Sequence, residues 1–378
     1  MAAAAHPARG AIDVAPVDSR TALRRFIHYP FDRYRGDSTW VPPLLVTEKE
    51  QFDPKNAFYQ HARVEFFLAR REGEIMGRVA AIDDDNHNET HGDNLVFFGF
   101  FEASDEDAAH ALLARVERWA EDLGRGAVRG PANPSLNHSA GLLVDAFDAD
   151  PFVMMPYNPP AYPKYMESAG YGKAKDLYAW VFESGQDISR LERLAARVRR
   201  RHPELVIRPV DMKRWNEELE RFRDLYNRAW EKNWGFVRYT NAEFDQLARE
   251  FRMILDPELV ALAEVDGELA GITVVLPDAN QIFKRMRGRL LPFGIFHFLN
   301  RKRIIDQMRL PILGVAPEHR NKGFEVAMIY ALYERAIAKG YRRCECSWTL
   351  EDNRSMNHVI EAGGGRHYKT YRIYQKDI

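Results

Sequence analysis

Residues 314–325 combine backbone freedom with positive charge in a pattern that suits phosphate binding. Arg320 and Lys322 come just before Gly323, and an amphipathic stretch that predicts a helix follows at once. A glycine-containing turn at the start of a helix exposes amide groups that have no partner inside the helix, and the helix dipole adds partial positive charge there. The pattern therefore predicts a site for a phosphorylated ligand. Glu325 fits less well, because a carboxylate in the first turn repels phosphate unless it points away, and an ordinary strand-to-helix turn is the alternative.

The elements that would position this segment occur twice along the chain, in the same order. The matching pairs are residues 12–18 and 206–211, 68–77 and 262–271, 112–124 and 328–340, and 133–138 and 353–358. They correspond to a first strand, a hairpin with a glycine turn, an amphipathic helix that ends at glycine, and a polar segment. We infer the duplication of one α+β domain, in which a mixed sheet is flanked by helices.

The junction between the two copies is expected near residue 185. A turn-rich break at 184–187 is followed by a strongly basic stretch that predicts a helix ending at Pro203. The expected segments are a disordered N-terminus at 1–11, a first domain at 12–184, a basic helical linker at 185–204, and a second domain at 205–378 with an insertion at 277–309.

The overall composition excludes several classes of protein. The chain has 378 residues, 46% of them hydrophobic, with 54 Lys and Arg against 55 Asp and Glu. Such a chain can fold around two cores, and a net charge of −1 does not suit a protein that binds nucleic acid. Cys344 and Cys346 are the only cysteines, too few for a disulfide framework or a four-ligand zinc site, so we expect a cytoplasmic protein without a metal. No apolar stretch is long enough to span a membrane.

The order of elements, together with the run Val-Ala-Pro-Glu-His-Arg-Asn-Lys-Gly-Phe-Glu at 315–325, resembles the GNAT superfamily of acyl-CoA-dependent N-acyltransferases. In that family a strand ending in V-x-P-x-x-R-x-x-G-x-G/A turns into a helix whose amide groups hold the pyrophosphate of coenzyme A. The resemblance implies acyl-CoA or acetyl-CoA as cosubstrate. The binding residues that it implies are Gly314, Val315, Arg320, Asn321, Lys322, Gly323, Phe324 and Asn353. The corresponding junction of the first half, residues 101–107, is acidic and lacks glycine and arginine, so only the second domain is expected to hold the coenzyme.

Several further strings are similar to a bacterial group of two-domain acyl-CoA N-acyltransferases that includes bacterial ceramide synthases. They lie at 40–44, 98–102, 130–133, 154–160, 351–353 and 368–371. This resemblance implies transfer of an acyl group to an amine, with a long-chain, sphingoid-like lipid amine as the narrower interpretation. The alternative is a catalytically degenerate protein that binds a lipid or a peptide, because Glu325 and Ile360 depart from the family pattern.

Three residues are candidates for the proton transfers that such a reaction needs. Glu351 and Asp352 follow the strand beside the expected thioester and are the candidate bases, although a helix cap explains Asp352 as well. The family's usual acid is a tyrosine at the position that Ile360 occupies in the second half. The first half keeps a tyrosine in the comparable segment, Tyr165, for which packing in the core is the alternative role.

Two other segments are candidates for contact with the acceptor. Residues 154–160 are rich in proline and carry Tyr157 and Asn158, which would form one rim of its cleft or a tight loop. The insertion contains an apolar decapeptide at 290–299, with cations on both sides within 284–303. It is too short to cross a bilayer but suits the anionic surface of the inner membrane or a lid over an acyl chain. A packed helical insertion is the alternative.

Overall fold

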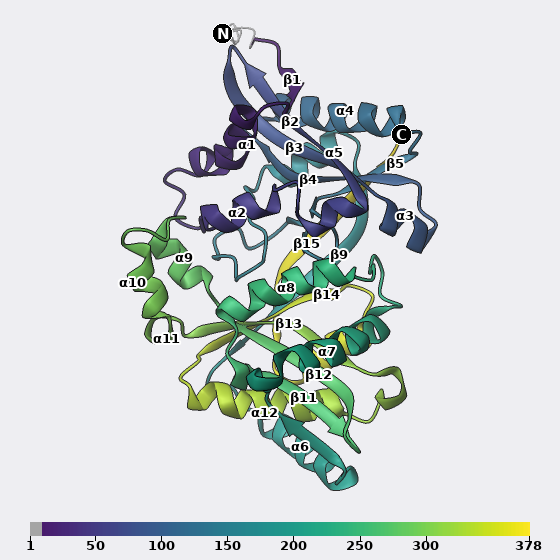
Figure 1. The fold of residues 1–378 in the computed structure, drawn as a ribbon, viewed down its shortest axis with the longest axis vertical. Helices are drawn as coiled ribbons and strands as arrows, with labels where there is room; N and C mark the ends of the chain where they lie inside the picture. Colours follow the sequence, from purple (N-terminus) through teal and green to yellow (C-terminus); the bar gives the residue numbers. More distant parts are fainter. Residues whose placement is uncertain (1–9) are drawn as a thin grey trace, which may run out of the picture.

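The computed structural model describes residues 10–378, and one long sheet runs through the whole molecule (Figure 1). Residues 1–9, which belong to the N-terminus expected to be disordered, lie outside the described residues.

The first half contains β1 (Asp13–Pro16), α1 (Arg20–Arg33), α2 (Leu45–Gln51), β2 (Ala62–Arg71), β3 (Glu74–Asp84), α3 (Asp85–His91), β4 (Leu95–Ala103), α4 (Glu106–Asp122), β5 (Ala127–Gly130), β6 (Ala132–Asn133), β7 (Ser139–Ala140), β8 (Leu142–Leu143), α5 (Tyr162–Ser168) and β9 (Gly172–Glu183). The predicted linker contains α6 (Ser189–Arg201). The second half contains β10 (Leu205–Arg208), α7 (Trp215–Trp230), α8 (Asn241–Ile254), β11 (Val260–Val265), β12 (Glu268–Pro277), α9 (Asn280–Met286), α10 (Gly294–Leu299), α11 (Arg301–Ile304), β13 (Gln307–Val315), α12 (Phe324–Ala338), β14 (Arg343–Leu350), α13 (Arg354–Ala362) and β15 (Arg366–Asp377).

Both halves pair their strands in the same way. The described residues form a sheet of 13 strands in the order β1-β2-β3-β4-β5-β15-β9-β14-β13-β12-β11-β10, with β8 against β15. Each half contributes one parallel pair, β4 with β5 and β13 with β14, whereas the hairpins are antiparallel. The prediction of two tandem domains with mixed sheets flanked by helices is confirmed.

The last strand of each half is inserted into the other half. β9 ends the first half but lies between β14 and β15 of the second, and β15 lies between β5 and β9. The boundary near residue 185 stays a prediction, and in the sheet each half is completed by a strand of the other.

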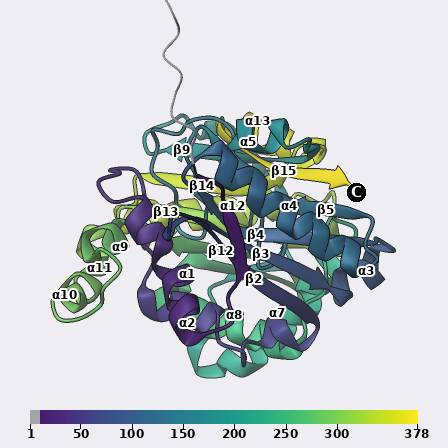
Figure 2. The same ribbon diagram turned by 90° about the horizontal axis from the view of Figure 1, so that it is seen from above.

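Helices cover both faces of the sheet. α1, α2, α7 and α8 lie on one face, and α4 and α12 lie on the other (Figure 2). α4 shows why these segments form helices: the Asp105 side chain caps the amide of Ala108, and Leu112, Leu113 and Val116 are fully buried at helical spacing. Each such side chain stabilises the fold by about 1.5 to 3 kcal/mol.

The predicted insertion forms α9, α10 and α11, which stand out at one side of the molecule (Figures 1 and 2). No helix within residues 10–378 has the length and apolarity needed to cross a membrane. The same residues contain no group of three or more His, Cys, Asp or Glu side chains placed to hold a metal ion.

Candidate functional site

The turn between β13 and α12 presents a row of free amide groups. Gly323 precedes the helix with a left-handed backbone (φ 82°), and no side chain caps the helix start. Asn321 is also left-handed, at φ 63°. In the described chain the amides of residues 321–325 donate no hydrogen bond, whereas those of His319 and Arg320 do. Five successive free amides at a helix N-terminus suit an anionic group such as a phosphate.

Cationic side chains surround this turn. Arg320 and Lys322 are exposed; Arg320 Nη2 donates to the carbonyl of Ala229 at 2.8 Å, and Lys322 Nζ lies 3.1 Å from His319 Nδ1. The pKa of His319 is lowered, first by burial and then by the Lys322 charge. The ring of Phe324 is fully buried between His202 and His319, so only its amide is available to a ligand.

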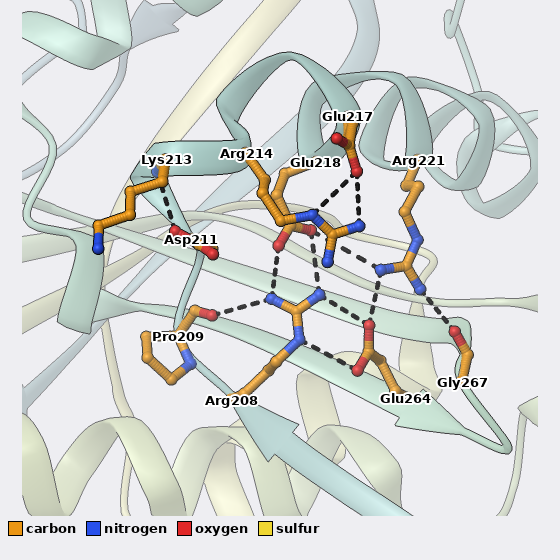
Figure 3. Close-up of polar contacts among 10 residues, drawn as sticks. All are labelled: Arg208, Pro209, Asp211, Lys213, Arg214, Glu217, Glu218, Arg221, Glu264 and Gly267. Carbon is orange, nitrogen blue, oxygen red and sulfur yellow. Dashed lines mark hydrogen bonds and ion pairs between the residues drawn. The ribbon is translucent and has the colours of Figure 1, made fainter.

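Helix α7 packs on β13, the strand that leads to the turn before α12. A Cβ on Gly314 would lie 2.2 Å from the Trp230 ring, so this close approach requires glycine. The other end of α7 is fixed by charge: Arg208 of β10 bridges Glu218 of α7 and Glu264 of β11, at 2.6 and 2.7 Å (Figure 3). The network therefore holds α7, and with it Trp230, in place over β13.

The matching junction of the first half is closed to anions. Asp105 caps α4, and Arg71 pairs with both Asp105 (2.6 Å) and Asp107 (3.0 Å). At the end of β4 the buried Glu102 accepts hydrogen bonds from the hydroxyls of Tyr34 (2.5 Å) and Tyr162 (2.8 Å). Carboxylates thus stand at the first-half junction, where they would repel a phosphate, whereas the turn before α12 combines free amides with cations.

The candidate bases lie at the carboxyl end of β14 and are paired with lysines of β9. Glu351 Oε2 lies 2.7 Å from Lys173 Nζ, and Asp352 Oδ2 lies 2.8 Å from Lys175 Nζ. The Lys175 ammonium lowers the pKa of Asp352. Glu351 also accepts from the backbone of β9, at the amide of Asp176 (3.0 Å). These contacts join the two halves, and the role of either carboxylate as a base stays a prediction.

Asn353 and Tyr165 also have structural contacts. Asn353 is the N-cap of α13, where its Oδ1 accepts from the amide of Met356 at 3.3 Å. Tyr165 packs beside Tyr162, with ring centroids 6.0 Å apart, in the core beneath α4. The structure therefore places Tyr165 in the first half, apart from the turn before α12, and its role as an acid stays a prediction.

The two predicted rim residues lie on the first half. The Tyr157 hydroxyl donates to Asp37 Oδ2 at 2.6 Å, and its ring contacts Tyr34. Asn158 is buried. Its Oδ1 accepts a hydrogen bond from the amide of Leu143 at 2.7 Å, and its Nδ2 donates to the carbonyl of Leu143 at 3.1 Å. Asn158 thus shapes the loop, and contact of either residue with a substrate stays a prediction.

The first half also holds the loop between α7 and α8. Asn137 Nδ2 donates to the carbonyl of Val237 at 2.6 Å, and the Tyr239 hydroxyl donates to the carbonyl of Asn137 at 2.8 Å. Trp234 of the same loop lies over Lys175, with the ammonium 5.5 Å from the ring centroid. Both halves therefore build the side of the second-half site that faces α7 and α8.

A buried polar cluster, which the sequence did not predict, lies where β13 and β14 stop pairing with each other. The parallel pairing ends at Leu310 and Cys346. Just before it, the fully buried Glu345 accepts from the hydroxyls of Ser347 (2.5 Å) and Tyr368, and Arg309 Nε donates to Ser347 Oγ at 2.8 Å. Charged residues at inward positions of otherwise apolar strands were the only signal in the sequence.

An apolar cavity of about 50 Å³ lies between α7, α8 and the sheet. Phe222, Ala248 and Phe251 line it from the helices, and Leu262 and Val274 line it from β11 and β12. Along α7, Phe222 is followed on the same face by Tyr226 and then by Trp230, which packs on Gly314. This row of rings links the cavity to the strand that leads to the phosphate turn.

Comparison with known proteins agrees with this geometry. Residues 219–364 match the acetyltransferase (GNAT) family. The chain is 38% identical over 377 residues to "Bacterial ceramide synthase" of Caulobacter vibrioides, which covers 97% of this chain and 98% of that protein. It is 31% identical over 370 residues to "Protein YghO" of Escherichia coli K12, with coverage of 95% and 94%. A solved tandem GNAT protein from the clavulanic acid biosynthesis pathway superposes with a TM-score of 0.60 at 13% identity, over 97% of this chain and 98% of that one.

The solved structure shows the fold, and the two relatives, similar over almost their whole length, show the family. The free amides, the glycine and the cations at the start of α12 agree with the coenzyme-binding motif of that family. The chain belongs to the GNAT family and is an acyl-CoA-dependent N-acyltransferase built of two tandem GNAT domains.

Proposed function

We propose that the second half transfers a long-chain acyl group from acyl-CoA to the amine of a long-chain lipid. Binding of acyl-CoA in the second half is supported by the row of five free amides at residues 321–325, which would bind the pyrophosphate. Residues 314–315 would line the path of the pantetheine arm, and Arg320 and Lys322 would add charge. The closed junction before α4 supports one donor site for each chain.

The reaction forms a bond between the amine nitrogen and the acyl carbon and breaks the bond from that carbon to sulfur. The attacking amine must be neutral, its proton must pass to a base, and the departing thiolate must take up a proton. Asp352 and Glu351 are the proposed bases, and Tyr165 is the proposed acid. Much of the rate gain in such a site comes from holding the amine against the thioester.

A lipid acceptor has two separate supports. One is the name of the Caulobacter relative, which ascribes ceramide synthesis to that protein. The other is the apolar cavity behind Phe222, which would receive part of an alkyl chain, from either the donor or the acceptor. Because the cavity measures only about 50 Å³, a long chain would also require α7 and α8 to move apart.

The proposal is tested by measuring thiol release with acetyl-CoA and palmitoyl-CoA, each with ethanolamine or a long-chain 2-amino alcohol. We expect release that depends on the amine, fastest with the two long-chain partners, and an amide product in the mass spectrum. Equal rates with ethanolamine and with the long-chain amino alcohol would overturn the proposal of a lipid acceptor, while acyl transfer itself would still be supported. Binding of palmitoyl-CoA without thiol release from any pair would instead support a degenerate binding protein.

A further inference from the structure

The insertion between β12 and β13 carries an apolar surface that acyl transfer does not explain. Four large side chains, here called the apolar tip, are mostly exposed: Leu291, Phe293, Phe296 and Leu299, at 70%, 76%, 60% and 66%. Phe293, Phe296 and Leu299 follow one another at intervals of three residues, so they lie along one side of α10. Their neighbours Leu290 and Phe298 pack against the core of the second half. The insertion is therefore a folded unit that turns one apolar side outward.

The tip is unusual within this molecule. Other exposed large apolar side chains of the described residues, such as Leu194, Val206 and Met253, are scattered over separate elements. Single exposed apolar residues are normal on a protein surface, whereas a cluster marks a site of interaction. Helix α10, which carries Phe296 and Leu299, stands at the outer end of the projection formed by α9, α10 and α11 (Figure 2).

Positive charge surrounds the tip and is not neutralised within the insertion. Residues 279–305 contain no Asp or Glu, although the whole chain has a net charge of −1. The cations are Lys284, Arg285, Arg287, Arg289, Arg301, Lys302 and Arg303. Lys284 pairs with Asp150 at 2.5 Å, and Arg301 lies over the ring of Phe298. The other five are exposed and take part in no ion pair with another described residue.

The positive charge continues onto the first half. The pKa of His28 in α1 is lowered by partial burial and then by the charges of Arg24, Lys49 and Arg289. Arg24 and Lys49 belong to α1 and α2, which lie next to the insertion: the amide of Leu45 donates to the carbonyl of Gly288 at 3.1 Å. The cationic surface thus reaches beyond the insertion itself.

We propose that the apolar tip docks on a bilayer that contains anionic lipids, with the tip among the lipid chains near the headgroups and the cations on lipid phosphates. A bilayer supplies both complements at once, an apolar interior and a negatively charged surface. Two copies of the chain do not, because residues 279–305 of each copy carry seven cations and no carboxylate, and two such segments repel one another. Docking of this kind needs no coenzyme, so its failure would leave the proposed transfer reaction untouched.

The experiment measures sedimentation of the full chain with vesicles of phosphatidylcholine alone or with 30% phosphatidylglycerol, without coenzyme. We expect binding to the anionic vesicles, weakened at least tenfold by raising the salt from 0.05 to 0.5 M. The triple variant Phe293→Ser, Phe296→Ser and Leu299→Ser should bind at least tenfold more weakly. The matched control is Leu194→Ser, Val206→Ser and Met253→Ser, which removes three exposed apolar side chains elsewhere and should bind like wild type.

A separate variant, Arg287→Gln with Lys302→Gln and Arg303→Gln, removes charge and leaves the tip intact, and should lose its preference for anionic vesicles. All variants should melt close to wild type, because the altered side chains are exposed. The proposal would be overturned by wild-type chain that stays in solution with anionic vesicles at low salt. Equal binding of tip and control variants would also overturn it, and so would a dimer that the tip variant abolishes, because the surface would then belong to a second copy.

Discussion

Gly323 and Gly340 stand at opposite ends of α12, and both have left-handed backbones, with φ of 82° and 86°. Alanine at either position should cost a similar backbone strain of about 1 to 2 kcal/mol. Only at Gly323 would the added carbon stand beside the free amides, 2.8 Å from Val198 Cγ2, whereas nothing lies within 4 Å at Gly340. We therefore expect Gly323→Ala to weaken coenzyme A binding at least tenfold in calorimetry, and Gly340→Ala to leave it unchanged. Unchanged affinity in both variants would place the coenzyme elsewhere.

Asp352 is the more exposed of the two proposed bases, and its partner controls its proton affinity. Replacing Asp352 with Asn should lower turnover by about 10²-fold and spare donor affinity, if it accepts the proton of the amine. Because the Lys175 ammonium lowers the pKa of Asp352, Lys175→Met should raise that pKa. The acidic limb of the pH–rate profile should then move to higher pH, since the base is protonated earlier on acidification. Lys173→Met is the control: it removes the lysine that pairs with Glu351, and it should leave this limb of the profile unchanged if Asp352 is the base. Wild-type turnover in both Asp352→Asn and Glu351→Gln would leave the proton to solvent or to another residue.

Only part of the candidate site could be predicted from the sequence. The phosphate turn could be predicted because its glycine, cations and following helix are contiguous at 315–325. The cluster around Glu345 could not, because its members come from three strands and meet only in the folded sheet. The lysine partners of Glu351 and Asp352 were missed for the same reason: they lie on β9, which the sequence assigns to the other half.

At the scale of elements, the α7–α8 pair offers a direct test of where an alkyl chain lies. Ala248 of α8 is buried and lines the apolar cavity, so Ala248→Leu should fill much of its space. We expect transfer from palmitoyl-CoA to fall at least tenfold relative to transfer from acetyl-CoA. Stability should change by less than about 1.5 kcal/mol, because filling a cavity offsets the strain of added atoms. Ala331→Leu, a similarly buried change on α12 at the opposite face, is the control. An equal loss with both donors would show that the cavity is not used by the acyl chain.

The helices and hairpins were predictable and the exchange of strands was not. The local spacing of apolar residues predicts both α4 and α12, and because the sequence is duplicated the same spacing occurs in each half. β9 and β15 each have 12 residues and end their halves in the same way, so local pattern does not indicate which neighbour each will pair with. That choice depends on contacts between residues far apart in the sequence, such as Lys173 with Glu351.

The exchange has a consequence for the whole molecule. Alone, residues 10–184 lack β15 between β5 and β9, and residues 185–378 lack β9 between β14 and β15. Each separate half thus exposes unpaired strand edges at its centre, which favours aggregation. We expect each half expressed alone to be insoluble or unfolded, and the two expressed together to form a soluble complex that binds coenzyme A. A soluble second half that melts cooperatively by itself would show that the exchange is not required for folding.

A histidine fixes the two halves to each other on the face covered by α2 and α8. His61 of the first half lies between Asp84 (3.0 Å) and Glu243 of α8 (3.1 Å). These carboxylates raise the pKa of His61 to about 9 against burial, which acts in the opposite direction. Because the folded protein holds this proton more tightly than the unfolded chain, whose His pKa is about 6.5, the stabilisation is complete below pH 6.5 and is lost as the pH rises through 9. The loss is at most about 3 kcal/mol, at 1.36 kcal/mol for each pKa unit.

Because the titration of His61 falls mainly between pH 7 and pH 9, comparison with a variant that lacks this histidine isolates its effect in that window. Burial raises the pKa of Asp278 to about 7, and that group also destabilises the fold as the pH rises, but most of its effect falls below pH 7. His138, which packs nearby, has a lowered pKa because it is buried and is neutral throughout the window. We therefore expect the melting temperature of wild type to fall between pH 7 and pH 9, and that of His61→Gln to start lower and change much less. His110→Gln, which removes a partly exposed histidine on α4, should keep the wild-type slope. The same slope in His61→Gln as in wild type would mean that His61 is neutral in the folded protein and that the halves are held together without its charge.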